Sequence, residues 1–116
     1  MQRHFRLRRN EDFGRLRREG RSYRHTFMTL SVAKNGLAHN RYGFITAKYL
    51  GNAVTRNRVR RLLRESVHLL HPRLRAGFDL VFIARQPVVG QPFAAVQRIV
   101  DELAQQAGVL VEGESQ

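Results

Sequence analysis

The sequence has no cysteine, no tryptophan and only three prolines. Without cysteine there is no disulfide, no thiolate metal cluster and no cysteine nucleophile. Long apolar runs are also missing, because the longest one, Leu80–Ala84, is far shorter than the roughly 20 residues that a membrane-spanning helix needs. The basic segment 1–9 leads into no apolar stretch, so we expect no signal peptide. These absences favour a cytoplasmic protein.

Acidic residues are scarce as well. Nine Asp and Glu stand against 21 Lys and Arg, which gives a formal net charge of +12 at pH 7. Only Lys34 and Lys48 are lysine, so arginine dominates the positive charge. An excess of this size favours a polyanionic partner. The length of 116 residues and the 42% of hydrophobic residues fit one domain over 1–116, with frayed ends at about 1–6 and 111–116.

Hydrophobic periodicity predicts at least three strands and three helices. Two segments alternate in polarity, whereas a third is apolar on both alternations, as expected of a strand covered on both faces. The expected strands are 26–33, 41–48 and 78–85, and the expected helices are 10–19, 54–70 and 92–107. Segment 36–40 is typical of a hairpin loop, and Tyr23 and the tail are candidates for further short strands. This order predicts an α+β sandwich with helices against one sheet.

The middle helix, 54–70, is apolar on one side and cationic on the other. At about 100° per residue, its apolar stripe is formed by Val59, Leu62, Leu63, Val67 and Leu70. The opposite face carries Arg56, Arg60 and Arg64 along one edge, with Asn57, Arg61 and His68 beside them. Gly51 and Asn52 supply a turn and a cap, so that backbone amides at the helix start also attract phosphate. Such a helix is otherwise typical of a solvated surface, but Glu65 is its only acid, which favours a bound polyanion.

The first helix combines an aromatic residue with cations. Phe13 lies close in sequence to Arg9, Arg15 and Arg17, a composition typical of surfaces that stack unpaired bases and hold their backbone. The alternative is that Phe13 is a core residue, because apolar residues at helical spacing usually pack inward. Both interpretations hold if this helix lines the edge of a groove.

No catalytic constellation of the chain's own side chains is evident. The acids are scattered, and adjacent pairs such as Glu11 and Asp12 do not converge on a point of a helix. The pair His68 and His71 falls short of the three or four ligands that zinc needs, so we predict no metal site. Phosphate-loop, dinucleotide-binding and nucleophile-elbow motifs are all absent.

Taken together, several segments resemble the bacterial ribonuclease P protein component. The specific signal is the Arg-Asn-Arg helix of 56–65 in its Gly-Asn-Ala-Val context at 51–54, and segments 7–13, 20–22 and 79–85 agree in register. The resemblance implies a two-layer sandwich of the ribosomal protein S5 domain 2-like type, with an about four-stranded sheet, three helices and a left-handed βαβ crossover. The general rule for parallel strands would instead give a right-handed crossover.

The resemblance also implies a function. In that family an RNA subunit uses magnesium to cut precursor tRNA and release its 5′ leader, and the protein binds both RNAs. The implied partners are therefore ribonuclease P RNA and precursor tRNA, with no membrane and no DNA, and with no cofactor held tightly by the protein. By matching position, the residues that face the catalytic RNA are Arg56, Asn57, Arg58, Arg60, Arg61 and Arg64.

A second set is implied for a leader-binding cleft between the first helix and the sheet. Its members are Phe13, Arg9, Arg17, Phe27, Thr29, Ser31, Ile45, Ala47, Lys48 and Tyr49. Tyr42 and Phe44 are then left for the core. Three positions depart from the family pattern: Arg17 and Ser31 replace frequent aromatics, and Tyr49 replaces a lysine. Stacking is therefore expected to depend on Phe13, Phe27, Tyr49 and arginine planes.

Two other functions fit part of the pattern. A structural ribosomal or RNA-chaperone protein would have the same size and charge, but would co-sediment with ribosomal subunits and ignore a 5′ leader. A metal-dependent nuclease acting alone would cleave without an RNA subunit, and it would need the acid cluster that the sequence lacks.

Overall fold

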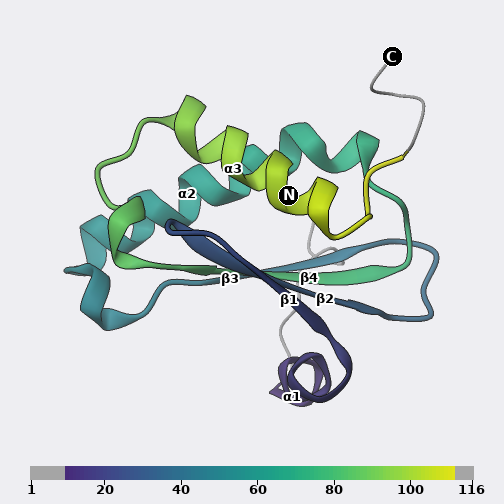
Figure 1. The fold of residues 1–116 in the computed structure, drawn as a ribbon. Coiled ribbons are helices and arrows are strands. Elements are labelled where there is room, and N and C mark those ends of the chain that lie inside the picture. Colours follow the sequence, from purple (N-terminus) through teal and green to yellow (C-terminus); the bar gives the residue numbers. More distant parts are fainter. Residues whose placement is uncertain (1–9, 112–116) are drawn as a thin grey trace.

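The computed structural model describes residues 10–111, and their side chains from residue 13 onward. These residues form three α-helices, four strands and three short 3-10 turns (Figure 1). In chain order they are α1 Asn10–Glu19, β1 Arg21–Arg24, β2 Met28–Lys34, β3 Arg41–Ile45, η2 Lys48–Leu50, α2 Ala53–Leu70, η3 His71–Arg73, β4 Phe78–Ala84, η4 Gln86–Val88 and α3 Phe93–Gln106. The predicted elements are therefore present, and β1 is the further strand expected near Tyr23.

The four strands form one sheet in the order β1-β2-β4-β3. β2 is antiparallel to both β1 and β4, whereas β3 and β4 are parallel. The prediction of a hairpin at 36–40 is wrong, because β4 lies between β2 and β3 and this segment passes the end of β4. There the Asn35 N–H donates to the Gly77 carbonyl over 2.9 Å. The central place goes to β4 because its residues are apolar on both faces, which suits a strand paired on both edges.

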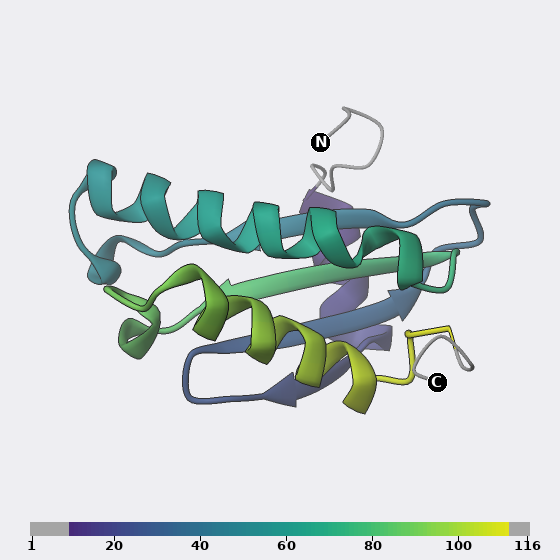
Figure 2. The same ribbon diagram turned by 90° about the horizontal axis from the view of Figure 1, so that it is seen from above.

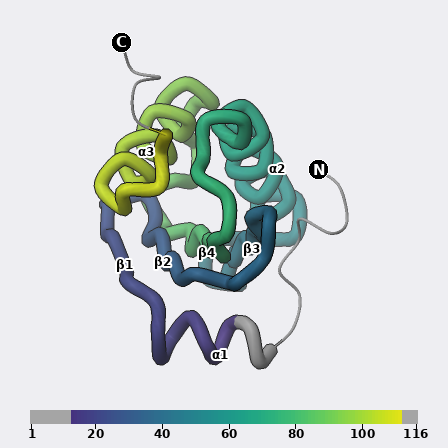
Figure 3. Tube along the Cα trace, turned by 90° about the vertical axis from the view of Figure 1, so that its right-hand side faces the viewer, coloured from purple at the N-terminus to yellow at the C-terminus, as the bar shows by residue number. Residues whose placement is uncertain are grey.

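The connection from β3 through α2 to β4 is left-handed, as the resemblance implies (Figures 1 and 3). A right-handed connection would put α2 on the other face of the sheet. That face carries Ser31 and Asp79, whereas the face that α2 covers carries Leu80 and Phe82. Burial of apolar surface therefore decides against the general rule here.

The main core lies between the sheet and the helix pair α2 and α3, which run side by side over one face (Figure 2). Tyr42, Phe82 and Leu63 are among its fully buried side chains, and Phe44 stacks on Phe82 with ring centroids 6.0 Å apart. The expectation that Tyr42 and Phe44 belong to the core is confirmed. Helix α1 lies alone on the opposite face and crosses the strands (Figures 1 and 3).

The helix caps and the C-terminal end of the described chain match the predictions from the sequence only in part. The Asn52 side chain accepts a hydrogen bond from the Thr55 N–H over 2.9 Å, so the predicted cap of α2 is confirmed. Pro92 precedes α3 as its N-cap instead of lying inside its first turn. At the other end, the Val111 N–H donates to the Arg73 carbonyl over 2.8 Å, so fraying does not begin at 111. The remaining predicted frayed residues, 1–6 and 112–116, lie outside the described part of the chain.

Within residues 10–111, none of the helices has the length and apolarity that crossing a membrane requires.

Candidate nucleic-acid interface

The face of the sheet beneath α1 is built from cross-strand rows of small and polar residues. Because side chains alternate along a strand, Met28, Leu30 and Val32 enter the main core while the residues between them face α1. One row contains Ser22, Ser31, Val81 and Gly43, with the two serine hydroxyls 3.1 Å apart. Among the described residues, the buried apolar cluster on this face is small and consists of Leu16, Ala33 and Val81.

Phe13 stands where α1 meets this row. A Cβ atom on Gly43 would lie 3.2 Å from Phe13 Cε1 and 3.3 Å from Val81 Cγ2, so the ring rests on the glycine backbone. Phe13 is only partly buried and packs against the small cluster. The Phe13 ring is therefore a packing contact of α1 that stands at the edge of the surface beyond, and its stacking on unpaired bases stays a prediction.

Beyond Phe13 the sheet is open. The next cross-strand row runs Arg24, Thr29, Ile83 and Ile45 over all four strands, and we call these four residues the open floor. Ile45 is 38% exposed, so part of its apolar side chain is open to a ligand. The predicted cleft residues Thr29, Ser31 and Ile45 thus share the face of α1, and an apolar patch rimmed by cations suits unpaired bases.

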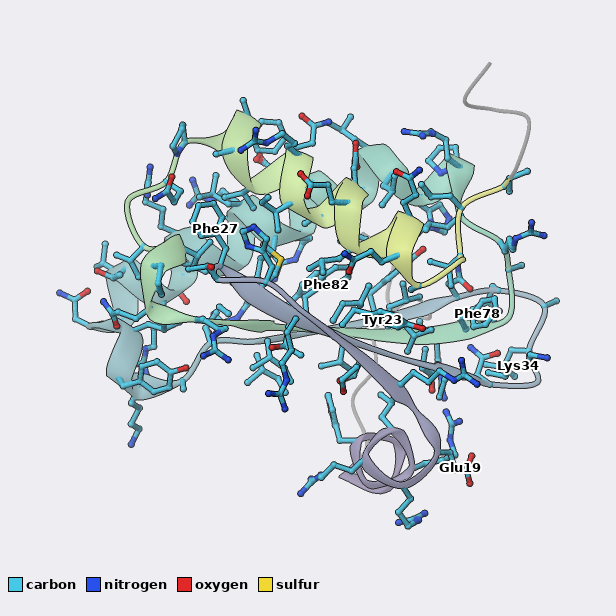
Figure 4. The ribbon with its side chains drawn as sticks, in the orientation of Figure 1. Glu19, Tyr23, Phe27, Lys34, Phe78 and Phe82 are labelled. Carbon is cyan, nitrogen blue, oxygen red and sulfur yellow. The ribbon has the colours of Figure 1, made fainter. Side chains whose placement is uncertain are left out.

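Of the remaining predicted cleft residues, some lie on or near the α1 face of the sheet and one does not. Ala47 is half-buried just past the end of β3, Lys48 and Tyr49 are exposed in η2, and Arg17 is exposed on α1. Phe27 is not brought to this face, because it packs against the main core on the side of α2 and α3 (Figure 4). The chain bends at Thr26 and Phe27 before β2 begins, so strand alternation does not extend back to Phe27. Arg9 lies outside the described residues.

On α2 the predicted arginine face is available for a partner. Asn57, Arg58 and Arg61 are exposed, whereas Arg56, Arg60 and Arg64 are half-buried along the edge of the helix. Among the described residues, ion pairs join Arg15 and Arg41 to acids, and none involves Arg56, Arg58 or Arg61. The guanidinium groups of Arg56, Arg58 and Arg61 are therefore not neutralised by acids within the described part of the chain.

Comparison with known proteins identifies the family. The family model for ribonuclease P matches residues 1–108. The chain belongs to the ribonuclease P protein family. Ribonuclease P protein components of Roseiflexus sp. (strain RS-1) and Roseiflexus castenholzii are 45% and 46% identical over 116 and 111 residues, which cover 99% and 95% of this chain and 95% and 91% of theirs.

Solved structures of the family share the fold. The ribonuclease P protein of Staphylococcus aureus has a TM-score of 0.85 at 29% identity, covering 91% of this chain and 97% of that one. The protein of Thermotoga maritima has a TM-score of 0.78 at 28% identity, covering 86% of this chain and 96% of that one. The predicted α+β fold with a four-stranded sheet and three helices is therefore confirmed.

One contact that sequence reasoning missed joins the two surfaces of this family member. Arg60 donates to Asn57 Oδ1 over 2.8 Å through one nitrogen and to Thr46 Oγ1 through the other. Thr46 follows Ile45 of the open floor directly. The arginine face of α2 and the open floor thus form one continuous surface around the free edge of β3. No local pattern indicates this contact, because it depends on β3 being an edge strand.

A second missed feature is a pocket at the end of the open floor. Its volume is about 760 Å³, and its lining residues are Arg24, His25, Thr26, Tyr49, Arg85, Gln86 and Pro87. The Tyr49 hydroxyl donates to the Ala84 carbonyl over 3.4 Å, which places the ring beside the end of β4. Two arginines, a histidine and an exposed aromatic ring make this pocket suitable for a phosphate and a base. The position of Arg85, a basic residue directly after the apolar strand β4, is the sequence signal that could have indicated this pocket.

Among residues 13–111, no three His, Asp or Glu side chains come together in a possible ligand group. That the protein itself holds no metal stays a prediction.

Proposed function

We propose that this chain is the protein subunit of a ribonuclease P ribonucleoprotein that removes the 5′ leader from precursor tRNA. The observation that carries the proposal is that the cationic arginine face of α2 meets the open floor, through the contact between Arg60 and Thr46. The arginine face binds the RNA subunit and the open floor binds the leader. A ribonucleoprotein of this kind works in the cytoplasm.

The arginine face of α2 suits a folded RNA. Exposed Arg58 and Arg61 present planar guanidinium groups that bind phosphate oxygens in pairs. The N-terminus of α2 lies at the same end, where backbone N–H groups favour negative charge. These contacts recognise backbone and shape, so they suit a structured RNA subunit.

The open floor suits a single strand. Phe13 and Ile45 offer apolar surface against which unpaired bases stack, and Arg17, Arg24 and Lys48 stand around it for the phosphates. A double helix would not place its bases against such a floor, because its bases are already stacked on one another. A 5′ leader, which is single-stranded, fits this chemistry.

We assign the chemical step to the RNA subunit and the magnesium ions that it holds. The protein contributes binding and orientation: by holding the leader and the RNA subunit on one rigid surface, it aligns the scissile bond with the RNA. Positive charge on the protein also offsets the repulsion between the two RNAs, so less magnesium is needed for assembly.

Reconstitution tests the proposal. The chain is mixed with a bacterial ribonuclease P RNA at near-physiological magnesium, and cleavage of precursor tRNA is followed with RNA alone and with protein alone as controls. We expect leader removal only when both components are present. Cleavage by the protein alone would instead identify a nuclease, and binding without any stimulation of leader removal would favour a ribosomal or chaperone protein.

A further inference from the structure

Asp79 is a fully buried carboxylate on the face of the sheet that α1 covers. Its side chain is 0% exposed. Arg41 on the neighbouring strand donates to it through Nε over 2.9 Å and through a terminal nitrogen over 2.8 Å, and Asn35 Nδ2 donates over 3.0 Å. This fork already pairs the charge of the carboxylate. A second guanidinium, from Arg15 of α1, also binds Asp79.

Arg15 fastens one flank of α1 to the sheet. Besides Asp79, its guanidinium donates to the Lys34 carbonyl over 2.6 Å and lies 3.8 Å from Glu19 Oε1. The end of the same helix approaches β2 closely, since a Cβ atom on Gly20 would lie 3.0 Å from the Val32 carbonyl oxygen. Figure 4 shows Glu19 and Lys34 toward the same end of the sheet, away from the end where Phe27 lies.

Phe13 lies toward the other flank of the helix. At about 100° per residue, Arg15 and Glu19 share one flank of α1 while Phe13 and Arg17 share the flank that faces the open floor. The apolar contact beneath the helix is small, because Leu16 is the only α1 side chain from residue 13 onward that is buried there. Such a contact leaves rotation of α1 about its own axis weakly determined, so a polar contact at one flank decides where the opposite flank lies.

We infer that the Arg15–Asp79 ion pair is a positioning contact that fixes the rotation of α1, and so holds Phe13 over Gly43 at the edge of the open floor. Arg15 and Asp79 are positioning residues and touch no leader nucleotide. This inference rests on the proposed function. It states that the Arg15–Asp79 pair affects affinity for the 5′ leader through the position of Phe13, whereas binding of the RNA subunit depends on α2.

Arg15→Met in the reconstituted holoenzyme tests the inference, with Arg18→Met as the matched control. Both changes remove one charge from α1, but Arg18 is exposed and has no described ion pair. Asp79 keeps Arg41 and Asn35 in Arg15→Met, so the chain is expected to fold. The readout is the ratio of affinities for precursor tRNA and mature tRNA. We expect a fall of about tenfold in that ratio for Arg15→Met, about 1.4 kcal/mol, and no fall for Arg18→Met.

The position of α1 is measured separately by NMR on the free full-length protein. Phe13 ring protons and the Gly43 Hα protons should show a nuclear Overhauser effect, because the ring rests on that glycine. We expect this signal to weaken in Arg15→Met and to persist in Arg18→Met. Arg15→Lys, which keeps the charge but not the forked geometry, should give an intermediate affinity ratio and an intermediate signal.

The outcomes separate this inference from the proposed function. A wild-type holoenzyme without preference for precursor tRNA would contradict the proposed function itself. If the wild type has that preference, an unchanged ratio in Arg15→Met overturns the inference. A reduced ratio with an undiminished Phe13–Gly43 signal also overturns it, because Arg15 would then act by touching the leader directly.

Discussion

The two faces of the sheet differ in how they are held. Among the described residues, a core of 20 buried apolar residues, Tyr42 and Phe82 among them, lies against α2 and α3, whereas the buried apolar cluster beneath α1 has only three members. On the α1 face, an ion-paired Asp79 and a glycine contact replace most of the apolar packing. The first face therefore supplies the stability of the fold, and the second supplies an exposed surface.

The proposed function explains this difference. If the open floor receives unpaired bases, residues such as Ile45 have to stay uncovered, so this face cannot be buried under helices as the other face is. A helix held by few contacts belongs to the less stable part of a protein, which is where binding elements are usually found.

The largest expected effect is on the core face. Leu63→Ala removes a side chain that is fully buried on α2 and should lower the free energy of unfolding by about 2–5 kcal/mol. Leu16→Ala makes the same chemical change on α1 and should cost less, at or below about 2 kcal/mol, because its cluster is small. Urea denaturation of both variants measures this, and equal losses would contradict the difference between the faces.

A smaller effect is expected on binding of the RNA subunit. Arg61→Ala removes an exposed guanidinium on α2 and should reduce the slope of log affinity against log salt by about 0.7–0.9, the value of one phosphate contact. Arg98→Ala removes an exposed arginine from α3 and should leave the slope unchanged. Equal changes in both variants would mean that net charge, not the arginine face of α2, binds the RNA.

The smallest effect concerns pH and again belongs to the core face. Burial lowers the pKa of His71 below 6.5, His68 adds to the shift, and the ring accepts or donates a 2.6 Å hydrogen bond with the buried Tyr42. Between the lowered pKa and 6.5 the unfolded chain binds more protons, so stability falls as the pH falls through this range. His71→Gln should flatten that dependence in urea denaturation from neutral pH to about pH 5. An unchanged slope would rule out this contribution.

The sequence predicted elements and faces well because both depend on local periodicity. The apolar stripe of α2 placed Leu63 in the core correctly, whereas the position of Thr29 beneath α1 was implied by the family resemblance. The order of the strands could not be predicted in the same way. The loop at 36–40 is locally suited to a hairpin, and a hairpin is excluded only because β4 lies between β2 and β3. The handedness of the crossover came from the family resemblance alone.

Single side chains were missed where they act over long distances in the sequence. The role of Asp79 was not predicted, because it is a single acid in an apolar strand and its partner Arg15 is 64 residues away in the sequence. Thr46 is another example, because its contact with Arg60 depends on the free edge of β3. Phe27 was misplaced because the chain bends before β2, which spacing alone does not reveal.

The central claim is that the open floor binds the 5′ leader of precursor tRNA and the arginine face of α2 binds the RNA subunit. The most direct test is the affinity of a Phe13→Ala holoenzyme for precursor tRNA and for mature tRNA, with Arg61→Ala measured in parallel for the RNA subunit. We predict that Phe13→Ala weakens precursor tRNA binding more than mature tRNA binding while its affinity for the RNA subunit stays at the wild-type value. Equal losses for both tRNAs would contradict the division and leave Phe13 as a packing residue only.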